Sequence, residues 1–336
     1  MSFDTKDIFV FIEQRNGVIA EGSRQLLAKS RELVKEIPSF DVVGVLLGHE
    51  VQGLADKVFA SGADKVILVD SPRLGRYNTQ HYAAALTSVC NEFKPDTVLL
   101  AATVIGRDLA PRVAARLNTG LTADATQIEV DTTSEHPGML LVTRPAFGGN
   151  LFGTIICPRT RPQMSTIRPH VFDELKEAYS GRRELMQHQV TFEEKDQVRF
   201  IRQIPKKEKS IDISKANVIL SGGRGMKDAY DLVVKIAQSI RATPGSSRAL
   251  VDAGIAPKPL QVGQTGTTVK PKVYIAVGIS GAVQHTAGMD KSDLIIAVNS
   301  DPKAAIFNVA HVGLVTDGHK VLPLIKEELL KAAEKK

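Results

Sequence analysis

The stretch KVYIAVGISGAVQH, residues 272–285, starts as an apolar strand and passes into a loop of small residues that leads towards a helix. The same order of strand, loop and helix recurs along the chain. Between residues 8 and 117, short apolar segments typical of strands alternate with longer segments whose apolar residues recur at helical spacing. Strands separated by such helices pair in parallel through right-handed crossovers. The sequence therefore predicts an α/β fold with mainly parallel sheets flanked by helices.

Residues 126–204 lack this regular alternation. Short strands are predicted there without intervening helices, and one polar helix is predicted around Phe172–Tyr179. We interpret the whole segment as an antiparallel annex on the first domain. The predicted strands are Thr126–Val130, Met139–Arg144, Leu151–Ile156, Gln163–Arg168, Gln189–Phe192 and Val198–Ile204.

The charged stretch Pro205–Ser210 contains a proline and separates two regions of α/β alternation. After it, the pattern restarts with a strand at Asn217–Leu220 and a helix at Lys227–Arg241. A chain of 336 residues with 43% hydrophobic residues has the length and apolar content for two domains. We therefore predict an N-terminal α/β domain at 1–205 and a C-terminal domain at 206–336.

Composition disfavours several classes of protein. The net charge of +6 is a small excess for this length, and the positive residues are densest at 206–209 and 331–336. No aromatic residues are interleaved there, so these segments are interpreted as solvated surface and not as a nucleic-acid site. Two cysteines, Cys90 and Cys157, cannot form a disulfide framework and are predicted to be small buried residues in a reducing compartment. Without a secretory signal or a membrane-length apolar run, we expect a soluble cytoplasmic protein.

Polar loops, most of them containing glycine, are concentrated in the C-terminal domain, and many of them fall just after predicted strands. The carboxyl ends of parallel strands meet along one edge of a sheet, which is where ligands of open α/β sheets bind. Six such loops would together suit a large polar ligand of dinucleotide size. The loops are Ser221–Gly225, Ser246–Arg248, Gln261–Gly266, Gly278–His285, Asn299–Pro302 and Asp317–Gly318.

Each loop alone is weak evidence. Ser221–Gly225 matches neither G-x-G-x-x-G nor a P-loop, and a tight turn without a ligand explains it equally well. Arg224 in this loop favours phosphate binding, because a guanidinium can bind a phosphate bidentately. For His285 alone, a helix residue with one ordinary hydrogen bond is a more common reading than a ligand contact.

Patterns for other chemistry are missing from the sequence. There is no G-x-S-x-G nucleophile elbow and no His/Cys/Asp cluster with metal-ligand spacing, so no metal is expected. The absence of G-x-G-x-x-G after a first strand argues against a nicotinamide-dependent dehydrogenase. In the N-terminal domain, the loop Thr103–Asp108 is predicted to cap a helix and to form an interface, not a nucleotide site.

At the C-terminal loops the sequence closely resembles the electron transfer flavoprotein alpha subunit family. The resemblance runs over essentially the whole chain and is densest after Asn217, and the order of its motifs is specific. It implies a nucleotide-hydrolase-like N-terminal domain and a Rossmann-like C-terminal domain that binds FAD. The shared stretches are Ser247–Gly254, Gln261–Gly266, Tyr274–His285 and Asn299–Phe307.

The resemblance also implies roles for individual residues. Arg224 should lie by the phosphate or ribityl region of FAD, and Ser247 and Arg248 against the isoalloxazine ring. Thr265 should form a hydrogen bond near N5 of the ring, and His285 should reach the C2 carbonyl. The other residues expected to contact FAD are Gln261, Val262, Gly263, Gln264, Gly266, Gly278, Ser280, Gly281, Ala282, Val283, Gln284, Asn299, Asp317 and Gly318, with Asn299 and Asp317 at the adenosine half.

Membership of this family would make the chain an electron carrier and not a self-sufficient enzyme. It would form a heterodimer with an electron transfer flavoprotein beta subunit that holds AMP or a second FAD, and Pro205–Ser210 would act as a hinge. Electrons would pass between a flavin dehydrogenase of the acyl-CoA type and another redox partner, with an NADH-dependent electron-bifurcating complex as one setting. The alternative is a nucleotide-binding interaction subunit without a redox role of its own.

One-electron reduction places negative charge on the N1–C2=O side of a flavin. A positive or hydrogen-bond-donating His285 and a cationic Arg248 would stabilise that charge and raise the first reduction potential. We therefore expect Arg248→Ala to lower this potential.

Overall fold

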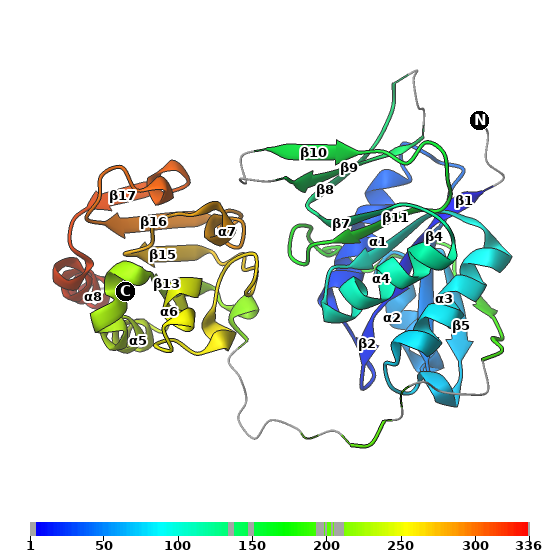
Figure 1. Cartoon of the computed structure of the whole chain (residues 1–336), viewed down its shortest axis with the longest axis horizontal. Coiled ribbons are helices and arrows are strands. Elements are labelled where there is room, and N and C mark those ends of the chain that lie inside the picture. The colour runs from blue at the N-terminus through cyan, green and yellow to red at the C-terminus, as the bar shows by residue number, and fades with distance from the viewer. Residues whose placement is uncertain are drawn as a thin grey trace. The chain divides into compact units, whose positions relative to one another are not determined.

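The computed structural model describes residues 5–334 except 134–137, 147–150, 193–197, 199, 203 and 205–211. The chain forms two compact units, the first containing the described residues up to Ile201 and the second those from Arg202 onward. The stretch Pro205–Ser210, predicted to be a linker and hinge, lies outside the described residues. Figure 1 labels most of the helices and strands of both units.

A seven-stranded parallel sheet forms the centre of the first unit, with the strand order β12-β5-β4-β1-β6-β11-β7. Its inner strands are buried on both faces, which explains why they appear in the sequence as continuous apolar runs. The strands are β1 Lys6–Ile12, β4 Val42–Gly48, β5 Lys65–Asp70, β6 Pro95–Ala101, β7 Leu121–Ala125, β11 Gln163–Ile167 and β12 Glu184–Gln187.

Helices cover both faces of this sheet (Figure 1). Successive side chains of a strand point to opposite faces, so Ile8 and Val10 of β1 join the core under α1 and α2, whereas Phe9 and Phe11 join the core under α3 and α4. The helices are α1 Glu21–Leu33, α2 Ala55–Ala60, α3 Thr79–Phe93 and α4 Val104–Arg116, with 3-10 turns η1 Gln52–Leu54 and η2 Pro72–Leu74.

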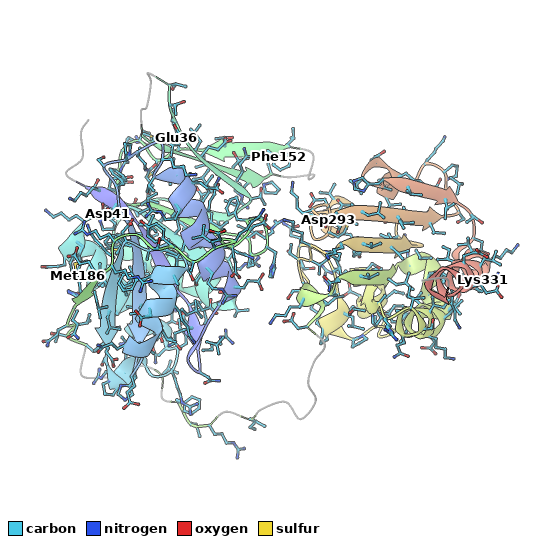
Figure 2. All side chains as sticks on the ribbon, turned by 180° about the vertical axis from the view of Figure 1, so that it is seen from behind. Glu36, Asp41, Phe152, Met186, Asp293 and Lys331 are labelled. Carbon is cyan, nitrogen blue, oxygen red and sulfur yellow. The ribbon has the colours of Figure 1, made fainter. Side chains whose placement is uncertain are left out.

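The antiparallel annex is smaller than predicted. It consists of β8 Gln127–Val130, β9 Leu140–Pro145 and β10 Phe152–Ile155, and Phe152, labelled in Figure 2, is 64% exposed. The predicted annex strand at Gln163–Arg168 is instead β11, which pairs in parallel with β6 and β7 inside the main sheet. A two-stranded hairpin, β2 Gln14–Arg15 with β3 Val18–Ile19, completes the strands of this unit.

The predictions for the end of the first unit were partly wrong. Residues 172–179 form no helix, because polar tertiary contacts hold this segment: Tyr179 donates a 2.6 Å hydrogen bond to Asp64, and Arg24 binds both carboxylate oxygens of Glu174 at 2.8 Å. The edge strand is Glu184–Gln187, not Gln189–Phe192, and the described residues of the stretch 198–204 form no strand. Cys90 is buried as predicted, but Cys157 is only partly buried.

The second unit is built on a five-stranded parallel sheet with the order β14-β13-β15-β16-β17. The chain direction across the sheet reverses between β13 and β15, a position where the loops of open α/β sheets leave room for a ligand. The strands are β13 Val218–Gly222, β14 Thr243–Ser246, β15 Val273–Val277, β16 Leu294–Asn299 and β17 Val312–Val315, and β17 is an exposed edge.

Two long helices, α5 Tyr230–Ser239 and α8 Gly318–Glu334, pack on one face of this sheet through Val233, Ile236 and Leu322. The predicted helix at Lys227–Arg241 starts later than expected, because Arg224–Ala229 form a 3-10 turn and α5 begins only at Tyr230. No helix in the described ranges is long and apolar enough to cross a membrane. The shorter elements are α6 Arg248–Asp252, α7 Val283–Thr286, η3 Ile213–Lys215, η4 Arg224–Ala229, η5 Lys258–Leu260 and η6 Ala305–Asn308.

Candidate cofactor site

A cavity of about 860 Å³ lies at the carboxyl ends of the strands of the second unit. All of its lining residues come from this unit, and each of the six predicted loops contributes at least one of them. The predicted residues that line it are Arg224, Ser247, Arg248, Gln261, Val262, Gly263, Thr265, Gly278, Ser280, Ala282, Gln284, His285, Asn299, Asp317 and Gly318.

Four predicted residues do not line the cavity: Gln264, Gly266, Gly281 and Val283. Three of them support the loops that do. Gln264 donates its backbone N–H to the Gln284 carbonyl over 2.7 Å, and a Cβ at Gly266 would lie 2.3 Å from the Gln261 carbonyl oxygen. Gly281 has φ +82° and faces Ile306, whose backbone nitrogen would lie 2.0 Å from an added Cβ.

The loops after β13 and β15 touch each other through glycines. Gly223 donates its N–H to the Val277 carbonyl over 2.8 Å, and Gly225 donates to the Gly278 carbonyl over 3.0 Å. A Cβ at Gly223 would lie 2.2 Å from the Gly278 oxygen, so only glycine allows this approach. The contact holds Arg224 at the cavity wall.

Three cationic side chains line the cavity. Arg224 is exposed and forms no ion pair within the described chain, and the same holds for Lys303, which the sequence analysis gave no role. Arg248 forms an ion pair of 3.1 Å with Asp252, and both side chains are more than 60% exposed. The carboxylates of Asp301 and Asp317 also line the cavity, so its wall carries only a small positive excess, and the unpaired Arg224 and Lys303 favour an anionic group of a ligand beside them.

A chain of hydrogen bonds orients the Thr265 hydroxyl. Lys258 Nζ donates to Gln261 Oε1 over 2.8 Å, which leaves the Gln261 amide nitrogen to donate to Thr265 Oγ1 over 2.9 Å. Because Thr265 Oγ1 accepts this hydrogen bond, its own proton remains for donation towards the cavity. Thr265 is thus arranged as a hydrogen-bond donor.

Asn299 and Asp317 are occupied by contacts within their own loops. Asn299 Nδ2 donates to the Ile279 carbonyl over 2.8 Å, and its Oδ1 accepts from the Asp301 backbone over 2.9 Å. Asp317 accepts from the His319 side chain and backbone, and these hydrogen bonds lower the pKa of its carboxyl. Both polar atoms of the Asn299 side chain are therefore used to hold the loops of the cavity wall.

His285 is 7% exposed and lies in α7 at the cavity wall. Its Nε2 lies 3.1 Å from the hydroxyl of Tyr274. Burial lowers the pKa of His285 to about 4, and an interaction with the Val262 backbone opposes only part of this effect. Of the two forms expected of His285, positive or hydrogen-bond-donating, burial favours the neutral, donating form.

Two buried polar atoms at the cavity wall, His285 Nδ1 and Ser247 Oγ, form no hydrogen bond within the described chain. Buried polar atoms of native proteins almost always have partners, so a polar ligand that reaches both atoms would complete the site. The sequence also missed several apolar lining residues. These are Met226, Ala249, Ile279, Val298, Ala304 and Ala305.

Comparison with known proteins assigns the chain to a family. A model described as "Electron transfer flavoprotein domain" matches residues 8–193, and one described as "Electron transfer flavoprotein FAD-binding domain" matches residues 212–290. The electron transfer flavoprotein subunit alpha of Thermoanaerobacterium thermosaccharolyticum is 44% identical over 331 residues, which cover 98% of this chain and 99% of that protein. The chain belongs to the electron transfer flavoprotein alpha subunit family. It therefore has a carrier role in electron transfer, and the family implies a beta-subunit partner.

Two other relatives of this electron transfer flavoprotein subunit carry more specific names. The acryloyl-CoA reductase electron transfer subunit beta of Anaerotignum propionicum is 43% identical and covers 95% of this chain and 94% of its own length. The lactate dehydrogenase (NAD(+),ferredoxin) subunit LctC of Acetobacterium woodii is 42% identical and covers 95% of this chain and 75% of its own length. The recognised FAD-binding domain contains all of the lining residues up to His285, which supports flavin binding in the cavity.

Proposed function

We propose that the second unit holds one FAD in this cavity and that the chain is the electron-carrying alpha subunit of a heterodimer with an electron transfer flavoprotein beta subunit. The observation that carries the proposal is the cavity itself. It combines about 860 Å³ of space, cations at its wall, glycine-dependent loops and two buried polar atoms that form no hydrogen bond with the described residues. These features suit a ligand with an anionic phosphate portion and a polar ring.

The residues of the chain would share the work of binding and orientation. Arg224 and Lys303 would neutralise phosphate charge, and the backbone of residues 280–284 would follow the pyrophosphate and ribityl portion. Ser247 and Thr265 would donate hydrogen bonds to the ring, and Arg248 would contribute positive charge beside it. When bound, FAD supplies the ability to accept and release electrons singly.

The relatives support the choice of partner. The printed name of one relative includes acryloyl-CoA reductase, which favours an acyl-CoA-type flavin dehydrogenase as the protein that exchanges electrons with this subunit. The other name includes both NAD(+) and ferredoxin. It favours, as a second candidate function, membership of an NADH-dependent electron-bifurcating complex.

Co-expression with the beta subunit encoded by the same genome tests the proposal. We expect a stable heterodimer with a flavin spectrum. Denaturation should release FAD, of which one molecule per heterodimer is bound by this chain. Charge-reversed Arg224→Glu should lower the FAD content, whereas Arg159→Glu, outside the cavity, should not. A heterodimer that remains colourless after incubation with FAD would contradict the proposal and favour an interaction subunit without a redox role.

A further inference from the structure

Lys258 lies outside the cavity but contacts two residues that line it. Its Nζ donates to the side-chain oxygen Oε1 of Gln261 over 2.8 Å and to the backbone carbonyl of Thr265 over 3.2 Å. Gln261 and Thr265 both line the cavity, whereas Lys258 does not. The contacts through which Lys258 can affect a bound ligand are therefore those with Gln261 and Thr265.

A short turn brings the Lys258 ammonium beside the Gln261 amide. The 3-10 turn η5 covers Lys258–Leu260, and the Gln261 backbone N–H donates to the Lys258 carbonyl over 3.1 Å. Side chains three residues apart are eclipsed in such a turn, so the two side chains lie together. Thr267 then donates its N–H to the Gln261 carbonyl over 2.8 Å and closes the loop that returns Thr265 to the same amide.

The ammonium decides the orientation of the Gln261 amide. Because an ammonium group only donates, the amide atom that faces Lys258 Nζ is the oxygen. The amide nitrogen then faces Thr265 Oγ1 and donates to it over 2.9 Å. In the reverse orientation two donors would meet at Lys258, and Thr265 would donate its proton to the amide oxygen. Gln261 is only 1% exposed, so such a mismatch of a buried polar group is unfavourable.

We propose that Lys258 is a positioning residue that fixes the Gln261 amide and so makes Thr265 a hydrogen-bond donor to an acceptor atom of the flavin ring. Thr265 is exposed at the cavity wall, so its hydroxyl proton can point towards a ligand. This inference rests on the proposed function, because it takes the flavin as the ligand and N5 as the atom nearest Thr265. N5 of the oxidised ring carries a lone pair and no proton. The site therefore prefers a ring with an acceptor at this position.

The first test compares FAD with 5-deaza-FAD, in which a C–H group replaces N5. The two molecules carry the same charge, so the ratio of their dissociation constants reports the contact at position 5 and not the charge of the cavity. We expect the heterodimer freed of flavin to bind FAD about 3- to 10-fold more tightly, as for one hydrogen bond. Thr265→Val removes the hydroxyl and keeps the shape of the side chain. Equal ratios in Thr265→Val and in the unmutated protein would overturn the donor role of Thr265.

The second test is Lys258→Met, which removes the ammonium and keeps an unbranched side chain. The amide can then turn, so we expect the ratio to fall to about 2-fold or less, whereas Lys258→Arg keeps a donor and should keep the ratio. In a Thr265→Val background, Lys258→Met should leave the ratio unchanged. An unchanged ratio in Lys258→Met alone would overturn the positioning role, whatever happens to the affinity for FAD.

Gln261→Glu reverses the hydrogen bond without touching Lys258. A carboxylate only accepts, so Thr265 must donate to it and no longer to the ring. We expect the preference for FAD over 5-deaza-FAD to disappear in this variant. A preference as large as that of the unmutated protein would show that the Gln261 amide does not set the role of Thr265.

Lys272→Met is the matched control for the loss of one positive charge. Lys272 is an exposed lysine of the second unit directly before β15, at the opposite end of this strand from the cavity. It should leave the ratio unchanged, and a fall equal to that of Lys258→Met would overturn the specific role of Lys258. A heterodimer that binds neither molecule would overturn the proposed function, whereas one that binds FAD with the same ratio in Lys258→Met would overturn only this inference.

Discussion

The Thr103 hydroxyl donates a hydrogen bond of 2.5 Å to the buried carboxylate of Glu13, where the adjacent strands β1 and β6 end. Thr103 also accepts from the Gly106 backbone over 3.0 Å and so caps α4. The predicted capping role of the Thr103–Asp108 loop is thus confirmed. In the first unit, the chain's own carboxylate lies at the position where the chain direction across the sheet reverses, a common ligand site in other α/β sheets.

Removal of this cap should destabilise the first unit. Thr103→Ala loses the N-cap and the donor to Glu13, so we expect the free energy of unfolding to fall by about 1–2 kcal/mol. Thr103→Ser keeps the hydroxyl and should lose less than half of that amount. Urea unfolding followed by circular dichroism compares the two variants. Equal losses would show that the methyl group, and not the hydroxyl, is important.

Gly281 should not tolerate a side chain. Its φ is +82° and an added Cβ would lie 2.0 Å from the Ile306 backbone nitrogen, so Gly281→Ala must displace the loop that carries Ser280. We expect at least about 2 kcal/mol of destabilisation and loss of most bound flavin. Gly254→Ala is the control, because Gly254 also has a positive φ of +72° but open space around it. It should cost about 1 kcal/mol and retain flavin.

Arg248 and Asp252 should affect the first reduction potential of the flavin in opposite directions. Arg248→Ala removes positive charge and should lower the potential, whereas Asp252→Asn removes the anion that pairs with Arg248 and should raise it. Both shifts should shrink in high salt, since both side chains are largely exposed. Anaerobic redox titration of the heterodimer measures the potentials. Shifts of the same sign would contradict this account of the pair.

His285 should make stability depend on pH. Its pKa is about 4 in the folded chain and 6.5 in the unfolded chain. Below pH 6.5 the unfolded chain therefore binds more protons than the folded one. Stability therefore falls as the pH drops from 6.5 to 4, by about 3 kcal/mol at most. His285→Gln should remove this part of the dependence. The free energy of unfolding of both proteins is measured at pH 5 and at pH 7. The difference between the unmutated chain and His285→Gln isolates the contribution of His285 from the titration of carboxylates.

The sequence predicted the α/β fold because strands such as β1, β4 and β15 are apolar and separated by amphipathic helices. It did not predict β14, whose sequence TPGS contains the two residues least typical of strands and forms only an edge. Neither could periodicity place β11, since strand pairing is decided by the chain's path and not by local pattern.

For the cavity, the glycine-containing loops and the family resemblance predicted most of the lining residues, because tight backbone turns require glycine and can be recognised in the sequence. They did not show the charge of His285, which depends on how deeply the fold buries it. The contact between Tyr274 and His285 was missed for a related reason. A tyrosine in an apolar strand indicates a buried hydroxyl that needs a partner, but only the three-dimensional structure identifies that partner.

All four residues of β17 are exposed, with Val312 at 47% and Val315 at 58%, and one side of the strand has no neighbour among the described strands. Unpaired strand edges with apolar side chains recruit further strands, including those of identical molecules. The consequence concerns gene dosage. A cell that synthesises this chain in excess should accumulate insoluble aggregates, so its soluble yield is limited by concentration as well as by the stability of its fold.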